Sequence, residues 1–296
     1  MKCRPARAKD NKAPGRWICA KANVSAAVDR GNRAKLPFVF PLQPARCLCL
    51  MNRLFSSSSQ LLLCLAADWD APLGRLQRFE RSPAGGWGAV GPVLPVTLGR
   101  AGLAWGRGLH PVLPGRTKRE GDGRAPAGAF AITAVFGYPA PDSSFARAAK
   151  LPYRWATRDL KCIDDPASAH YNRVLDQSSL AQPDWASCED MLRSDQRYVV
   201  GAVVAHNAAP PLAGCGSCIF LHVWEAPGMP TAGCTAMSLA DMTEIAGWLD
   251  GAAVPVLVQL PQVEYEGLRE AWGLPAFVSD ARRLTTAAEP DGMPRR

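Results

Sequence analysis

Short apolar runs separated by turn-forming residues are the feature that most restricts how this chain can fold. Gly, Pro and Asp interrupt the runs at intervals that suit β-strands and are too short for long helices. The pattern predicts a mainly β domain, of the β-rich α+β class, over about residues 58–275. Its candidate strands are residues 60–67, 76–80, 86–95, 130–136, 198–206, 217–224 and 254–259.

One segment has the spacing of an amphipathic helix. Ser238 is a suitable N-cap, and Asp241 three residues later completes a pair of the capping-box type. Apolar residues then recur at helical spacing up to a stop at Asp250 and Gly251; they are Leu239, Met242, Ile245, Ala246 and Leu249. A shorter helix is predicted over residues 187–194. The domain is therefore expected to contain one or two short helices.

Positive charge is concentrated at the N-terminus. Residues 1–53 contain twelve Lys or Arg and only two Asp, a charge of +10, so the rest of the chain carries −2 of the total +8. A near-neutral domain without a basic stripe argues against nucleic-acid binding. Residues 1–55 are interpreted as a disordered leader or as a translated region before a true start at Met51, with a basic anchor as the alternative. Residues 276–296 are predicted to be a flexible tail.

Residues 51–68 have two interpretations. They resemble a short signal peptide, with Arg53 ahead of an apolar run, but the run is short and follows four serines. The preferred interpretation is a first β-strand over residues 60–67 that ends in a turn near Pro72. No apolar run reaches about 18 residues, so no transmembrane helix is predicted.

The clearest chemistry lies in residues 214–237, which read GCGSCIFLHVWEAPGMPTAGCTAM. His222 lies twelve residues before Cys234, which follows Gly233 in a tight turn. A cysteine attacks as its thiolate, and an unperturbed thiol with a pKa of roughly 8.5 needs a nearby base to ionise at neutral pH. Gly233 allows a sharp turn that aims backbone N–H groups at an oxyanion beside the sulfur. If the turn led directly into the helix predicted after it, the helix N-terminus would favour the thiolate further. Cys234 is thus the candidate nucleophile, His222 the general base and acid, and Gly233 an oxyanion donor.

Other interpretations of the same residues stay open. Cys234 can also be interpreted as a small buried thiol, and His222 as a core histidine on an apolar strand. Cys215 and Cys218 form a Cys-x-x-Cys unit, which in a thioredoxin-type site would stand at a strand-to-helix turn. With His222 and Cys234 they could ligate zinc, although the spacing fits no common structural zinc pattern. The cysteines are irregularly spaced in a chain that can build its own core, so no disulfide framework is predicted.

The cysteine turn resembles the catalytic core of the L,D-transpeptidase (YkuD-type) family, bacterial enzymes that cross-link peptidoglycan. That family has a histidine, a spacer and then a cysteine in a Ser/Thr-His-Gly-Cys turn. This chain has a shorter spacer, Ala232 in place of the usual second histidine, and Ala236 in place of a frequent arginine. The residues that match are Thr231, Gly233 and Cys234.

A second block supports the resemblance. Residues 118–130, KREGDGRAPAGAF, are similar to the family's upstream segment of a basic residue, Gly-Asp and a Pro-x-Gly unit. The two blocks stand in the expected order, and the resemblance covers roughly residues 60–260. It implies a catalytic domain of the β-sandwich or barrel type.

The resemblance also implies a function. A cysteine acyl-transferase would cleave the meso-diaminopimelate–D-alanine bond of a peptidoglycan stem peptide through a thioester, and then transfer the acyl group to an amine or to water. Ser217 and Thr231 are expected to contact substrate, with no metal or organic cofactor. A monomer in the periplasm or cell envelope is expected. A zinc-binding module and a non-catalytic wall-binding module are the alternatives.

Overall fold

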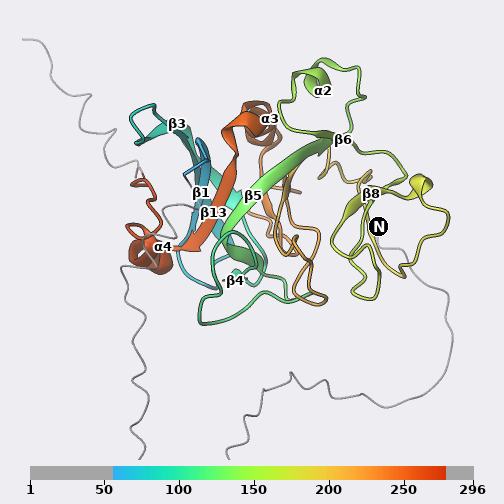
Figure 1. Ribbon diagram of the computed structural model, residues 1–296, viewed down its shortest axis with the longest axis horizontal. Coiled ribbons are helices and arrows are strands. Elements are labelled where there is room, and N and C mark those ends of the chain that lie inside the picture. The colour runs from blue at the N-terminus through green and yellow to red at the C-terminus, as the bar shows by residue number, and fades with distance from the viewer. Residues whose placement is uncertain (1–55, 278–296) are drawn as a thin grey trace, which may run out of the picture.

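The computed structural model describes residues 56–277 and consists mainly of strands (Figure 1). The strands are β1 (Gln60–Ala66), β2 (Leu73–Arg81), β3 (Trp87–Thr97), β4 (Leu103–Trp105), β5 (Ala125–Gly137), β6 (Tyr153–Trp155), β7 (Leu160–Cys162), β8 (Val174–Asp176), β9 (Glu189–Asp190), β10 (Val200–Val204), β11 (Phe220–Val223), β12 (Thr235–Met237) and β13 (Val256–Pro261). The helices are α2 (Ser144–Ala148), α3 (Leu239–Trp248) and α4 (Gln262–Leu268), with short 3-10 turns η1 (Gln177–Ser179) and η2 (Gly251–Ala253). The predicted leader, residues 1–55, and all but the start of the predicted tail lie outside the described residues.

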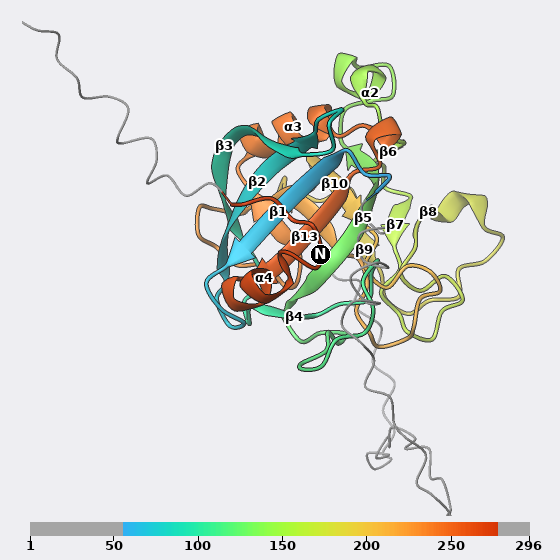
Figure 2. The same cartoon turned by 60° about the vertical axis from the view of Figure 1, so that its left-hand side comes forward.

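The main sheet closes on itself. Strand β10 pairs with β11 and also with β5, so the order β10-β11-β12-β3-β2-β1-β13-β5 returns to its start. Strands β4 and β6 add to β5 outside this circuit. Figure 2 shows β3, β2, β1, β13 and β5 side by side across one wall. Closure leaves few open strand edges, and the prediction of a mainly β fold of the barrel type is confirmed.

The apolar run near residue 60 is a central strand. Every residue of β1 is buried, and β1 pairs parallel with β13 and antiparallel with β2. A strand covered on both faces needs a continuous apolar sequence rather than an alternating one, which explains why this run could also be taken for a signal peptide. The strand interpretation of residues 60–67 is confirmed.

The principal helix is confirmed with its cap. The Ser238 hydroxyl accepts a hydrogen bond from the Asp241 N–H at 3.1 Å, and α3 packs its buried face against β10 and β11. Residues 187–194 are not helical: they form the two-residue strand β9 and turns, so that prediction is wrong. No helix within residues 56–277 is long and apolar enough to cross a membrane.

A small sheet of order β8-β7-β9 lies beside the barrel; we call residues 156–198, which contain it, the cap. Two kinds of link join the cap to the loop before β11. A disulfide joins Cys162 to Cys218, and the Asn172 side chain donates to the carbonyls of His206 and Asn207, both at 2.8 Å. The Asn172 carbonyl oxygen also accepts from the Cys218 N–H at 3.0 Å. The sequence predicted no disulfide framework, and this disulfide shows that the prediction was wrong. Its two cysteines are 56 residues apart, and no local sequence pattern reveals that they pair.

Removing the disulfide should destabilise the protein. Closing a loop across 56 residues stabilises the native state by roughly 4 kcal/mol in the chain-entropy account, and measured values are often lower. We expect the double variant Cys162→Ala/Cys218→Ala to lose about 2–4 kcal/mol of unfolding free energy in urea titrations.

The matched control is Cys215→Ala, which removes a thiol that forms no disulfide. This variant should be nearly as stable as the wild type. Reductant should destabilise both proteins, because both keep the Cys162–Cys218 disulfide. Equal stability of the double variant and the wild type would show that the cross-link contributes nothing.

Candidate active site

One cavity holds both candidate catalytic residues. It has a volume of about 240 Å³ and is lined by Cys234 and His222 together with residues of the cap. Strands β11 and β12 run parallel with His222 opposite Ala236, so Cys234, the residue just before β12, lies beside Phe220 at the start of β11. The remaining lining residues are Cys188, Glu189, Arg193, Arg197, Tyr198, Trp224, Glu225, Met229, Pro230, Thr231 and Ala232.

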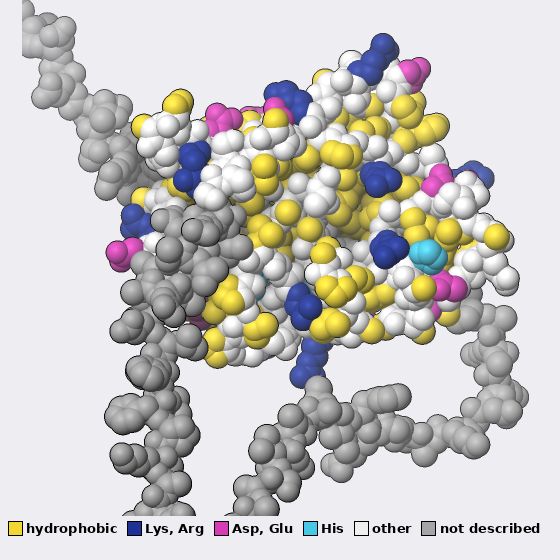
Figure 3. Space-filling model, in the orientation of Figure 1, with side chains coloured by type: hydrophobic (Ala, Val, Ile, Leu, Met, Phe, Trp, Pro, Cys, Tyr) yellow, Lys and Arg dark blue, Asp and Glu magenta, His cyan; other side chains and the backbone are white. Residues whose placement is uncertain are grey.

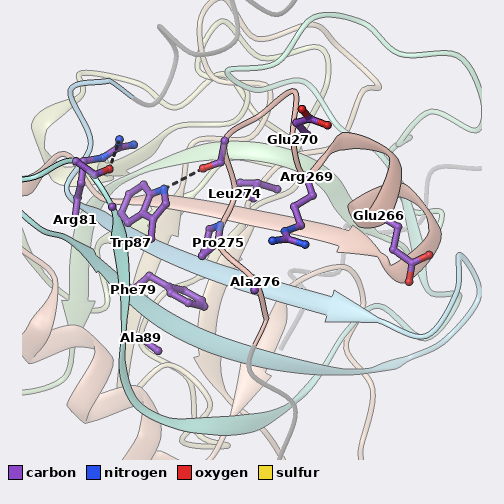
Figure 4. Close-up of a pocket in the computed structure, with 13 residues that line it drawn as sticks. Phe79, Arg81, Trp87, Ala89, Glu266, Arg269, Glu270, Leu274, Pro275 and Ala276 are labelled. Carbon is purple, nitrogen blue, oxygen red and sulfur yellow. Dashed lines mark hydrogen bonds between the residues drawn. The ribbon is translucent and has the colours of Figure 1, made fainter.

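A larger cavity, of about 830 Å³, lies elsewhere in the domain. It lies between the β2–β3 ribbon and the segment after α4, where the Trp87 indole N–H donates to the Gly273 carbonyl (Figure 4). None of the residues that line it is a cysteine, serine or histidine. It therefore offers neither a nucleophile nor a histidine base, and the chemistry of this chain points to the smaller cavity.

Thr231 shapes the cysteine turn. Its hydroxyl accepts from the Gly233 N–H at 3.0 Å and donates to the Cys234 carbonyl at 2.7 Å. A side chain on Gly233 would come within 3.0 Å of the Arg124 carbonyl oxygen, so close packing explains this glycine. Because Thr231 already accepts from the Gly233 N–H, that group is not free for an oxyanion in this conformation.

The Cys234 sulfur is held by the backbone of the preceding segment. The Phe220 N–H donates to Sγ at 3.3 Å, and the thiol donates to the Cys218 carbonyl at 3.5 Å. Only 8% of Cys234 is exposed. The turn leads into β12 before α3 begins, so the condition for help from the helix N-terminus is not met.

His222 has a defined tautomer. Its Nδ1 lies 2.8 Å from the Val223 carbonyl oxygen, which can only accept, so Nδ1 carries the hydrogen and Nε2 carries the lone pair. The ring also meets Tyr198 edge-on, with 5.4 Å between ring centroids. His222 is buried and lines the cavity, and this tautomer is the one that can accept a proton at Nε2.

Burial keeps both candidate groups neutral. It raises the pKa of the Cys234 thiol to about 12, and the Glu189 carboxylate raises this pKa further. The hydrogen bond from the Phe220 N–H and the positive charges of Lys118 and Arg193 act in the opposite direction and lower it. Burial also lowers the pKa of His222 to about 4. The resting site therefore holds a thiol and a neutral imidazole rather than a thiolate–imidazolium pair.

Ser217 lies apart from this cavity. Its hydroxyl donates to the Glu120 carboxylate at 2.8 Å, and the Tyr171 hydroxyl donates to the same oxygen at 2.6 Å. Ser217 does not line the cavity of Cys234, whereas Thr231 does. In the upstream block, Asp122 organises the loop by accepting from Lys118 Nζ at 2.6 Å and from the Arg119 and Arg124 N–H groups at 2.8 and 2.9 Å.

The proposed zinc ligands do not come together. Cys218 is bonded to Cys162 and has no thiolate to offer, and no group of three His, Cys, Asp or Glu in residues 56–277 is arranged to hold a metal. His206, a further buried histidine, is fully hydrogen-bonded: Nε2 donates to the Cys215 carbonyl and Nδ1 accepts from the Arg107 N–H. It has a structural role.

Comparison with models of protein families identifies the family of this chain. The L,D-transpeptidase catalytic domain (YkuD) matches residues 93–258, from within β3 to within β13. The chain belongs to this family. No curated protein and no solved structure matches it. Members of the L,D-transpeptidase family are in general enzymes of peptidoglycan cross-linking, which agrees with a cysteine and a histidine in one cavity.

In this L,D-transpeptidase domain, the cap supplies cavity residues that sequence reasoning missed. The Tyr198 hydroxyl donates to the Glu189 carboxylate at 2.6 Å, and Arg193 lies over the Tyr198 ring at 5.0 Å. Arg193 and Arg197 both pair with Asp195. No motif marks these residues, because they reach the cavity only through the fold of the cap.

The charge of Glu189 should control how readily Cys234 ionises. A carboxylate disfavours a nearby thiolate, so we expect Glu189→Gln to lower the thiol pKa and speed alkylation of Cys234 severalfold at pH 8–9. Rates should be followed with iodoacetamide by peptide mapping, which separates Cys234 from the other cysteines.

Glu225→Gln is the control, because Glu225 lines the same cavity but pairs with Arg197. It should change the rate less than Glu189→Gln does. An unchanged or slower rate for Glu189→Gln would contradict the electrostatic assignment.

Proposed function

We propose that this protein is a cysteine acyl-transferase that acts on peptidoglycan stem peptides, as an L,D-transpeptidase or L,D-carboxypeptidase. The observation that carries the proposal is the presence of Cys234 and His222 in one cavity, with the His222 lone pair on Nε2. Family membership supports the substrate class. Peptidoglycan stem peptides are the proposed partner, without a metal or organic cofactor.

The mechanism is acyl transfer in two steps. As Cys234 Sγ attacks the carbonyl of the meso-diaminopimelate–D-alanine bond, its proton passes to His222 Nε2. The imidazolium then protonates the departing D-alanine amine, which leaves a thioester on Cys234. An amine or water attacks the thioester, His222 takes a proton from this second nucleophile, and Cys234 recovers its thiol.

Proton transfer should accompany attack rather than precede it. With a thiol pKa of about 12 and an imidazole pKa of about 4, a separated ion pair is strongly disfavoured in the resting cavity. The developing oxyanion needs N–H donors, and Gly233 can contribute only if it leaves Thr231. The Cys234 N–H is the alternative donor in this turn.

A location outside the cytoplasm is part of the proposal. The substrate class lies in the cell wall, and the Cys162–Cys218 disulfide suits an oxidising compartment. Periplasm or cell envelope is the location that fits both observations. A monomer without nucleic-acid partners is retained as the expected state.

A non-catalytic wall-binding module is the second candidate, favoured by the deep burial of the Cys234 thiol. Rapid alkylation near neutral pH is not expected for either candidate, because the thiol pKa is raised. Turnover is therefore the measurement that separates them.

Substitution of Cys234 tests the proposal directly. Incubation with disaccharide-tetrapeptide should release D-alanine, measured by mass spectrometry. Cys234→Ala should release none, and His222→Ala should be slower by about 10²–10⁴-fold because it lacks the base.

Cys215→Ala removes a cysteine outside the cavity and should keep wild-type activity. Melting curves should show that each variant folds. Release by Cys234→Ala at the wild-type rate would remove the nucleophile assignment, and no release by the folded wild type would favour the wall-binding module.

The pH profile tests the role of His222. Its pKa of about 4 means that the base form persists well below neutrality, so kcat/KM should fall only as pH approaches about 4. An acid limb near 6.5, the ordinary histidine value, would contradict this assignment.

Stability must be followed in parallel. His206 and His222 both have native pKa values of about 4 against about 6.5 when unfolded, so the unfolded chain gains protons first. Stability is therefore lost as pH falls from about 6.5 towards 4. Circular dichroism at each pH separates this loss from titration of the base.

A further inference from the structure

A second cavity lies on the other side of the segment that holds the Cys234 sulfur. It has a volume of about 430 Å³, is open to solvent, and lies between the barrel strands β5, β10 and β11 and the cap strands β7 and β8. Cys218 and Phe220, which hold Cys234 Sγ through their backbone groups, line this cavity, whereas Cys234 and His222 do not. It is therefore separate from the catalytic cavity.

The rim of this second cavity is positively charged. Arg154 of β6 and Arg173, just before β8, both line it and are both exposed, and no lining residue is acidic. Within residues 56–277, neither guanidinium makes a hydrogen bond or ion pair. The catalytic cavity differs, since Glu189 and Glu225 face its two arginines. On the face in Figure 3, Lys or Arg side chains and a histidine border an apolar surface on the side of β6 and β8.

The walls behind the rim are mainly apolar. They include Val203, Val204, Leu175 and Phe220 as well as the Cys162–Cys218 disulfide. Asn172 lines the cavity too, but its side-chain donors and its acceptor are already used by the backbone. If a ligand buried many polar groups against these walls, the groups would lack hydrogen-bond partners, which costs binding free energy. An aliphatic chain has no such groups and can be buried there without this cost.

We propose that this cavity is a binding site for a small aliphatic carboxylate. The carboxylate would pair with the guanidinium groups of Arg154 and Arg173, and the aliphatic chain would lie against the apolar walls. Arginine suits this role because its planar fork matches a carboxylate. A volume of about 430 Å³ is within the usual range of small-molecule sites. The proposal does not depend on the function proposed for Cys234.

Calorimetric titration of the full chain with octanoate tests the site. Binding should be saturable, with affinity rising about fourfold per methylene from butanoate to octanoate, the value of one buried CH₂. Octylamine, which has the opposite charge on the same chain, should not bind. N-acetyl-D-alanine, a peptide-like carboxylate, should bind more weakly than octanoate because its amide would be buried without partners.

Arg154→Gln and Arg173→Gln should each weaken octanoate binding about tenfold, the effect of losing one charge-assisted hydrogen bond. Arg158→Gln is the matched control, since Arg158 is an exposed arginine of the cap that does not line the cavity. All three residues are on the surface, and unchanged melting temperatures should confirm that the variants fold.

Three results would overturn the proposal. The first is no saturable binding of octanoate, and the second is equal binding of octylamine or of N-acetyl-D-alanine. The third is an octanoate affinity of the Arg154→Gln and Arg173→Gln variants that equals the affinity of the Arg158→Gln control.

Discussion

The parallel pairing of β11 with β12 is the constraint on which the candidate active site depends. It places His222 opposite Ala236, so that Cys234, two residues earlier, meets the same cavity. It also brings the Phe220 N–H and the Cys218 carbonyl to the sulfur. Barrel closure through β10 holds β11 from its other side. The candidate nucleophile is therefore held by hydrogen bonds to the backbone of β11 and the loop before it, and not by a helix N-terminus.

The cap supplies part of the wall of the cavity that holds Cys234 and His222. Its contribution to the catalytic cavity includes Glu189, Arg193 and Tyr198, and its anchors are the Cys162–Cys218 disulfide and Asn172. These anchors act on the loop before β11, the same segment that holds the sulfur. A change in the cap would thus reach Cys234 through the backbone, and also through Tyr198, which shares a buried cluster with the thiol, and through the charge of Glu189.

The sequence predicted the parts of the structure that local patterns determine. The apolar run of β1, the Ser238 cap of α3 and the turn from Thr231 to Cys234 each have a local physical signature, and each is found. Residues 187–194 were predicted to be a helix because their local pattern allows one. They instead contain the two-residue strand β9, whose pairing with β7 is a long-range interaction.

Long-range contacts also determine features of the candidate site that the sequence does not show. Ser217 stands close to His222 in sequence, yet it turns towards Glu120, nearly a hundred residues upstream. No disulfide was predicted for Cys218, and its partner Cys162 lies in a segment without a motif. The protonation state of Cys234 could not be predicted from the sequence either, because its pKa depends on burial by the cap and on the charge of Glu189. In the proposed reaction the thiol and the imidazole are both neutral before substrate binds, so attack on a bound carbonyl would be coupled to proton transfer from Cys234 to His222. Ala232 stands where the resemblance expects a second histidine, and Glu189, Arg193 and Tyr198 of the cap line the same cavity.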